Sequence, residues 1–212
     1  MDFSFHSLVG IALGIGLAAA TGFRIFIPLL LAGLAARFNV LPLGDSFQWL
    51  ASTPALLMLG TAAVAETLAY YIPGVDHALD VVASPATLAA GVVASAAVMT
   101  DIPPEVMWPV AVIAGGGAAG LTKGSTALLR AKSGLMTGGL ANPVVSTVET
   151  VGATGLSLLA IVVPLLCLVA VVALLWWATR KAGRVLFGRR SPADLRPESG
   201  PETRQDSPPA AR

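Results

Sequence analysis

The sequence predicts an all-α fold, that of a polytopic helical membrane protein with five to seven spans. Hydrophobic residues make up 55% of the 212 residues and charged residues only 12%, whereas soluble domains usually carry about 25% charged residues. Nine of the 25 charges lie in residues 189–212, which leaves 16 for residues 1–188. Uncharged runs of 17 residues or more separate many of these 16, and about 20 apolar residues cross a bilayer as a helix.

Charge and motif content argue against several other classes of protein. The net charge of +1 gives no electrostatic basis for a nucleic-acid partner. The single cysteine, Cys167, cannot form an intrachain disulfide and is typical of a small apolar filler. Because no Gly-x-Ser-x-Gly, His-Glu-x-x-His or paired-cysteine motif occurs, we expect no enzymatic activity, no cofactor and no metal site.

Residues 7–38 form the first hydrophobic stretch, which is too long for one untilted span and short for two. The sequence Thr21-Gly-Phe-Arg24 interrupts it. A span is therefore expected before Arg24 and a shorter or re-entrant helix after it, with Pro28 in the first turn of that helix. No basic region or cleavage site of a secretory signal precedes the stretch, so it is expected to be a retained span.

The next segments are a connection and a span. Residues 39–52 are expected to return along the membrane interface as a loop, with Trp49 as an interfacial anchor. Residues 53–72 are predicted to span the membrane, because Thr53 suits the N-cap and Pro54 a helix-start position.

The middle of the chain predicts two further spans. Residues 74–83 are amphipathic, and the Ser84-Pro85 pair is expected to start a span that ends near Thr100. A short acidic turn, Asp101–Glu105, leads into a span over residues 106–121, which is rich in glycine near its end.

The last part of the hydrophobic region begins with a basic segment that carries Lys123, Arg130 and Lys132. Residues 143–179 then fit either two helices hinged at Pro164 or one re-entrant piece and one long span.

The C-terminal end predicts both orientation and disorder. Arg180, Lys181 and Arg184 follow an aromatic pair, which places the C-terminus in the cytoplasm by the positive-inside rule. The basic segment is expected to be cytoplasmic as well. This requires an even number of membrane crossings between the basic segment and the C-terminus. Residues 189–212 contain five prolines and almost nothing apolar, so this tail is expected to be disordered outside the helical domain of residues 1–188.

The segment Glu66–Asp80 carries the most informative candidate site. It places a carboxylate, Glu66, directly after the 20 uncharged residues 46–65 and before a Pro-Gly break. A charged group within a membrane helix is costly unless it faces a partner or a water-filled cavity. Asp76 and Asp80 follow at helical i,i+4 spacing and are candidate contacts for a substrate or ion. A metal site that also uses His77 is less favoured than a solvated turn, since His77 points away from that helix face.

Two roles are open for the carboxylates at membrane depth. Glu66 and Glu149 are either binding sites for a proton or cation, or halves of buried ion pairs, Glu66 with Arg24 and Glu149 with Lys123, that fix helix packing. The functional role is slightly favoured, because ionisable groups within the membrane are often functional.

The glycine-rich run Gly115-Gly-Gly-Ala-Ala-Gly120 matches a dinucleotide-binding pattern literally. That fingerprint also needs an acidic residue about 20 positions further on, and residues 136–148 contain none. Close helix packing in lipid is the favoured interpretation.

Two halves of the chain, residues 7–100 and 104–180, suggest an inverted internal repeat. Each contains a small-residue helix end followed by one cation, Arg24 or Lys123, and later a glutamate followed by threonine. Small transporters often consist of two such halves with broken helices. The alternative is that membrane helices rich in alanine, glycine and leucine resemble one another by composition.

The order and spacing of these motifs resemble the domain of unknown function 4126 family. The motifs are Thr-Gly-Phe-Arg24, Glu66 with Ile72-Pro-Gly-Val-Asp76 and Asp80, Ala114-Gly-Gly-Gly-Ala-Ala-Gly120, and Asn142-Pro143 with Glu149. The resemblance covers roughly residues 8–180 and implies a small multi-pass membrane protein without an assigned activity. This chain departs from many members at Tyr70-Tyr71, where those members place an acidic–basic pair.

Two functional hypotheses follow. The first is a small transporter or permease of the cell (inner) membrane, expected as a homodimer, that moves a small anionic solute or protons at Arg24, Glu66, Lys123 and Glu149. The second is a non-transporting membrane scaffold or assembly protein whose buried charges are structural.

Overall fold

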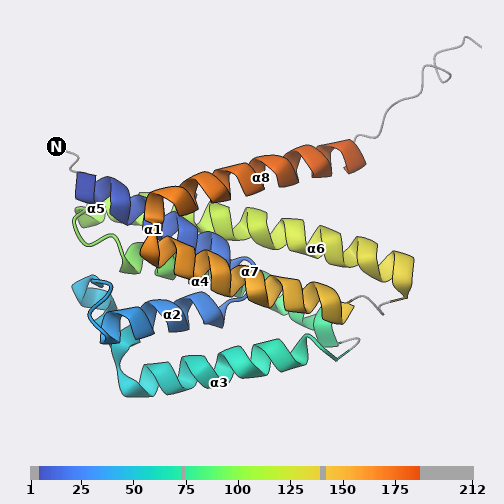
Figure 1. The fold of residues 1–212 in the computed structure, drawn as a ribbon, viewed down its shortest axis with the longest axis horizontal. Helices are drawn as coiled ribbons and strands as arrows, with labels where there is room; N and C mark the ends of the chain where they lie inside the picture. The colour runs from blue at the N-terminus through green and yellow to red at the C-terminus, as the bar shows by residue number, and fades with distance from the viewer. Residues whose placement is uncertain (1–4, 73–74, 139–141, 187–212) are drawn as a thin grey trace, which may run out of the picture.

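The computed structural model describes residues 5–72, 75–138 and 142–186, and the regular secondary structure of these residues is entirely helical (Figure 1). The all-α prediction is therefore confirmed. The elements are α1 (Phe5–Thr21), α2 (Phe26–Arg37), the 3-10 helix η1 (Asp45–Ala51), α3 (Thr53–Ala69), α4 (Val75–Ala97), α5 (Pro104–Val110), the π-helix η2 (Ala111–Gly116), α6 (Gly117–Thr137), α7 (Asn142–Val162) and α8 (Pro164–Leu186).

Helix α1 lies at the centre of the bundle and packs against α4, α6, α7 and α8. Its C-terminal half is a run of small residues that ends in Ala18, Ala19 and Ala20, all without solvent exposure. Small side chains let neighbouring helix backbones approach closely, which is how helices associate in lipid. The composition of α1 thus explains its central position.

Glycines set the contacts among α1, α4 and η2. A Cβ atom added at Gly14 would lie 2.9 Å from the Ser95 hydroxyl, and one added at Gly115 would lie 2.5 Å from the Ser95 Cβ. Both glycines are therefore needed for backbone approach to α4. This geometry supports the packing interpretation of the glycine-rich run over the nucleotide-binding one.

The predicted interruption after the first span is confirmed. Helix α1 ends at Thr21 and α2 begins at Phe26, and the backbone of Gly22 lies against Thr122 of α6 too closely for any side chain. The break leaves the N-terminal backbone groups of α2 without partners from its own helix. They become part of the site described below.

Other predicted boundaries differ from the structure. Ser52, not Thr53, is the N-cap of α3, and its hydroxyl accepts a hydrogen bond from the Ala55 backbone N–H. No new helix starts at Pro85, which lies inside the continuous helix α4. Membrane helices tolerate an internal proline where neighbouring groups satisfy the freed backbone.

The predicted loop and basic segment are also partly helical. Residues 45–51 of the predicted loop form η1. The span predicted over residues 106–121 continues through the basic segment, so that Pro104–Thr137 is one helical stretch of 34 residues. The two-helix interpretation of residues 143–179 is confirmed, because α7 ends at Val162 and α8 begins at Pro164.

The helices are apolar enough for a membrane protein. Pro104–Thr137 and Pro143–Val162 are each long and apolar enough to cross a bilayer, and Asp45–Ala51 with Thr53–Ala69 make a third, bent by 65°. The described chain also holds four shorter apolar helices: Phe5–Thr21, Phe26–Arg37, Val82–Ala97 and Pro164–Trp177. The number of spans from five to seven and the internal repeat stay predictions, and the tail predicted to be disordered lies outside the described residues.

Candidate functional site

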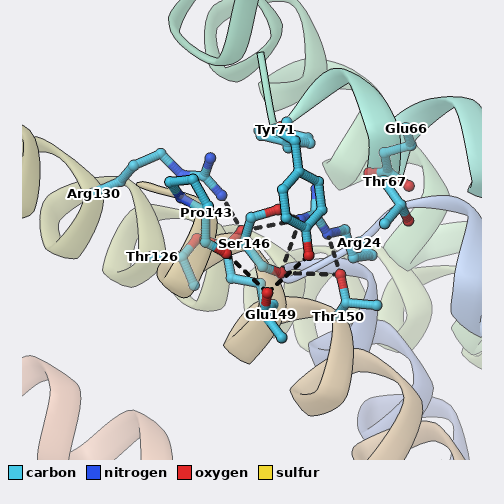
Figure 2. Close-up of polar contacts among 12 residues, drawn as sticks. Arg24, Glu66, Thr67, Tyr71, Thr126, Arg130, Pro143, Ser146, Glu149 and Thr150 are labelled. Carbon is cyan, nitrogen blue, oxygen red and sulfur yellow. Dashed lines mark hydrogen bonds and ion pairs between the residues drawn. The ribbon is translucent and has the colours of Figure 1, made fainter. Parts of the chain in front are cut away.

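The break between α1 and α2 directs Arg24 into the protein interior, where its side chain is 0% exposed. Its guanidinium contacts one face of α7, which presents Ser146, Glu149 and Thr150 at i, i+3 and i+4 (Figure 2). Nε donates to the Thr150 hydroxyl at 3.2 Å, and Nη2 donates to the Ser146 carbonyl at 3.0 Å and to the Ser146 hydroxyl. Nη2 also lies 3.8 Å from Glu149 Oε2. Arg24 is thereby fixed by both hydrogen bonds and charge.

Arg130 approaches the same carboxylate from α6. Its Nη2 donates a hydrogen bond to Glu149 Oε2 within an ion pair, and both side chains are almost completely buried. Glu149 therefore bridges two arginines that come from distant parts of the chain (Figure 2). Charge-assisted hydrogen bonds to arginine are among the strongest in proteins.

Tyr70, at the C-terminal end of α3, is the residue on which three cations converge. The Cζ atoms of Arg24 and Arg130 lie 4.2 and 4.4 Å from the centre of its ring. Lys123 Nζ lies 3.1 Å from the Tyr70 hydroxyl oxygen and donates a hydrogen bond to it. The ring is itself buried, so these cation–π contacts are largely removed from water. Such contacts are stronger when desolvated than at an exposed site.

Glu66 lies one turn before Tyr70 on α3 and contacts the start of α2. Its carboxylate accepts hydrogen bonds from the backbone N–H of Ile25 at 2.9 Å and of Phe26 at 3.2 Å. A carboxylate is stabilised there because the first N–H groups of a helix lack intrahelical partners and carry the positive end of its dipole. The side chain thus joins α3 to the break that positions Arg24.

The profile of one protein family, described as Domain of unknown function (DUF4126), matches residues 11–184. The chain belongs to this family. No curated protein and no solved structure matches the chain. The DUF4126 description assigns no activity, so the roles of its residues in this chain rest on the geometry above.

The partners of the two carboxylates in this DUF4126 protein differ from the predicted ones. The ion-pair alternative placed Glu66 with Arg24, but the Glu66 carboxylate instead accepts hydrogen bonds from the backbone N–H groups of Ile25 and Phe26. It placed Glu149 with Lys123, whereas the ion pairs of Glu149 within the described part of the chain are with Arg130 and Arg24. The reason is that residues 123–132 are helical, so Lys123 and Arg130, two turns apart, both face the interior.

This burial also removes one orientation argument. Lys123 and Arg130 lie inside the bundle rather than in a loop, so they carry no information on the positive-inside rule. The requirement for an even number of crossings after the basic segment then rests on the exposed Lys132 alone. Arg180 remains exposed and contacts the Trp176 ring at 4.3 Å from its centre, which suits the predicted aromatic and basic flank.

Four residues of the site were missed by the sequence interpretation: Tyr70, Arg130, Ser146 and Thr150. Tyr70, Arg130 and Ser146 stand at helical spacing from a residue that was identified, at i+4 from Glu66, i+7 from Lys123 and i−3 from Glu149, and Thr150 directly follows Glu149. Helical periodicity extended through the basic segment would have indicated Arg130. Nothing in the sequence indicated that Tyr70 would meet three cations.

Asp76 and Asp80 lie on α4, but their side chains are outside the part of the chain that the structure describes. Their predicted roles as substrate or ion contacts are therefore not tested. Within residues 5–72, 75–138 and 142–186, no group of three or more His, Cys, Asp and Glu side chains could hold a metal ion.

The chemistry available to the site is recognition of negative charge. Guanidinium groups offer planar forks of donors that match carboxylate and phosphate oxygens, and lysine adds a compact charge. Arg24 Nη1 is fully buried and has no hydrogen-bond acceptor within the described part of the chain. A buried donor without an acceptor is rare and calls for an explanation.

Proposed function

We propose that the protein is a small transporter or permease for an anionic solute, with the site around Arg24, Glu66, Lys123 and Glu149. The observation that carries this proposal is the convergence of three cations, one from the α1–α2 break and two from α6, on one buried position. Ionisable side chains within membrane helices usually mark substrate or ion pathways.

Helix interruptions beside the charges support this function. Arg24 lies in the break between α1 and α2, and the π-helix η2 interrupts the stretch that carries Lys123 and Arg130. Secondary transporters commonly bind substrates at discontinuous helices, where half-helix N-termini attract anionic groups. The finer parts of the proposal are five to seven spans, two related halves, a cell (inner) membrane location, a cytoplasmic C-terminus and a homodimer.

Glu66 would couple transport to protons in this proposal. It is half-buried, and its carboxylate occupies the anion-binding end of α2. Protonation would weaken its hold on these N–H groups, because they favour negative charge. Binding of a proton would thereby loosen the contact between α3 and the break.

The test is flux into proteoliposomes with an imposed pH gradient, for wild type and Glu66→Gln. We expect uptake of at least one small oxyanion by wild type and a loss of about tenfold in the variant, equal to roughly 1.4 kcal/mol of barrier. Glu105→Gln, at an exposed carboxylate of α5, is the matched control and should transport as wild type does. Equal flux for wild type and Glu66→Gln across phosphate, sulfate and short mono- and dicarboxylates would count against transport.

A scaffold function is the second candidate, and a specific observation favours it. Glu149 is 4% exposed and already bridges Arg24 and Arg130, as a purely structural ion pair would. The scaffold hypothesis expects the charges to affect only stability. Variants that retain full stability but lose flux would therefore separate the two functions.

A further inference from the structure

Helix α3 lies at the edge of the bundle and packs against α2 and η1, not along the core helices α1, α4 and α6 (Figure 1). Only Ala55 and Ala63 of its 17 residues are buried, and apolar side chains such as Leu57, Met58 and Leu68 are exposed. Little apolar packing therefore holds α3 against the core helices α1, α4 and α6.

Polar contacts hold the C-terminal end of α3. The Glu66 carboxylate accepts hydrogen bonds from the two backbone N–H groups at the start of α2. The Tyr71 hydroxyl is hydrogen-bonded to the Thr147 hydroxyl of α7 at 2.8 Å. Tyr70 lies between Glu66 and Tyr71 in the chain and inserts into the buried cluster of Arg24, Lys123 and Arg130. Figure 2 shows Glu66 and Tyr71 from the α3 side of this contact and Ser146, Glu149 and Thr150 from α7.

Tyr70 is an uncharged side chain in surroundings suited to an anion. Its hydroxyl oxygen accepts a hydrogen bond from Lys123 Nζ at 3.1 Å, as an oxygen of a carboxylate or phosphate would. The two guanidinium groups lie against its ring and also bond acceptors on α7, Arg24 to Ser146 and Thr150 and Arg130 to Glu149. Arg24 Nη1, wholly buried, lacks an acceptor within the described residues, which is a second and independent sign of an oxyanion position.

We propose that residues 66–71, the C-terminal end of α3 and the two residues after it, are a plug, and that Tyr70 occupies the position where an oxyanion group of the solute binds. This inference rests on the proposed function and names its substrate class. Solute and Tyr70 compete for the same cations, so α3 has to withdraw Tyr70 before the solute can bind. The sparse packing of α3 makes that movement less costly than displacement of a core helix.

The first test measures thermal stability of the purified protein with increasing sodium phosphate or sodium succinate, against sodium chloride at equal ionic strength. Tyr70→Ala opens the position and is expected to gain a concentration-dependent rise in Tm with the oxyanions, since a ligand stabilises the state that it binds. Tyr70→Phe keeps the ring in place and should respond as wild type does. The double variant Arg24→Gln/Tyr70→Ala should lose the gain. An equal response of Tyr70→Ala and wild type, or a gain that survives in the double variant, overturns the proposal.

Hydrogen exchange in the wild-type protein gives a second test that does not depend on a variant folding. Saturating phosphate or succinate is expected to speed amide exchange in residues 66–72 relative to chloride, because the plug leaves the site. Unchanged or slower exchange there overturns the plug. Wild-type flux without these responses would leave transport standing and the plug wrong, whereas a gain in Tyr70→Ala without any wild-type flux would contradict transport and keep the oxyanion site.

Discussion

Glu149 of α7 connects Arg24 to Arg130, two side chains separated by more than a hundred positions in the chain. The three groups tie the α1–α2 break, α6 and α7 into one buried unit. Taking charges out of water is costly, so such a unit is stable only while its charges and hydrogen bonds remain matched.

Glu149→Gln is expected to destabilise the protein by about 3–5 kcal/mol, the usual cost of breaking a buried ion pair by removing one partner. Both arginines would stay buried next to an uncharged amide. The measurement is reversible unfolding in mixed micelles, and Glu105→Gln provides a control at an exposed carboxylate that should change stability by no more than about 0.5 kcal/mol.

The partner of Glu149 can be tested by a double-mutant cycle with Arg130→Gln. Because the two side chains share one ion pair, their effects should be non-additive by about 1–3 kcal/mol. Additive effects would mean that the contact contributes nothing of its own to stability.

Much of the fold followed from the sequence because apolar length and helix-breaking residues act locally. The break before Arg24 and the hinge at Pro164 were predicted from local patterns, and both are confirmed. Pro85 misled the prediction because its local pattern was read as a helix start. Its neighbours in the fold, and not the local sequence alone, decide whether a helix continues through a proline.

The candidate site was only partly predictable. Arg24, Glu66, Lys123 and Glu149 were identified because a charge is conspicuous among apolar residues. Their partners were not, because an ion pair depends on which helices meet. The insertion of Tyr70 from the edge helix α3 among three cations is a tertiary event without a sequence signal.

Arg24→Lys tests whether the planar guanidinium, and not only its charge, is required. Arginine reaches Thr150 through Nε and Ser146 through Nη2, whereas lysine has a single nitrogen that cannot occupy both positions. A loss of about 1–3 kcal/mol is therefore expected for the acceptors left buried. Arg37→Lys is the control, because Arg37 makes one long hydrogen bond of 3.4 Å to the Ala51 carbonyl at the surface. Unfolding curves that shift equally in both variants would contradict a special role for the Arg24 fork.

Gly115 and Gly117 form a matched pair for testing the packing of η2 and α6 on α4. A Cβ at Gly115 would lie 2.5 Å from the Ser95 Cβ, whereas a Cβ at Gly117 would meet nothing within 4 Å. Gly115→Ala should therefore destabilise the protein by about 1–3 kcal/mol through overpacking. Gly117→Ala should be neutral or stabilise it by up to about 1 kcal/mol, because alanine is the better helix former.

Unfolding free energies of the two alanine variants decide this comparison. Opposite signs for the two positions would confirm that backbone approach explains the glycine-rich run. If both variants were stabilised alike, α4 would have to yield easily at Ser95, and the close contact would then be incidental to the fold. Because Ser95 is fully buried and also faces Gly14, it has little room to move, so the expected result is a loss at Gly115 alone.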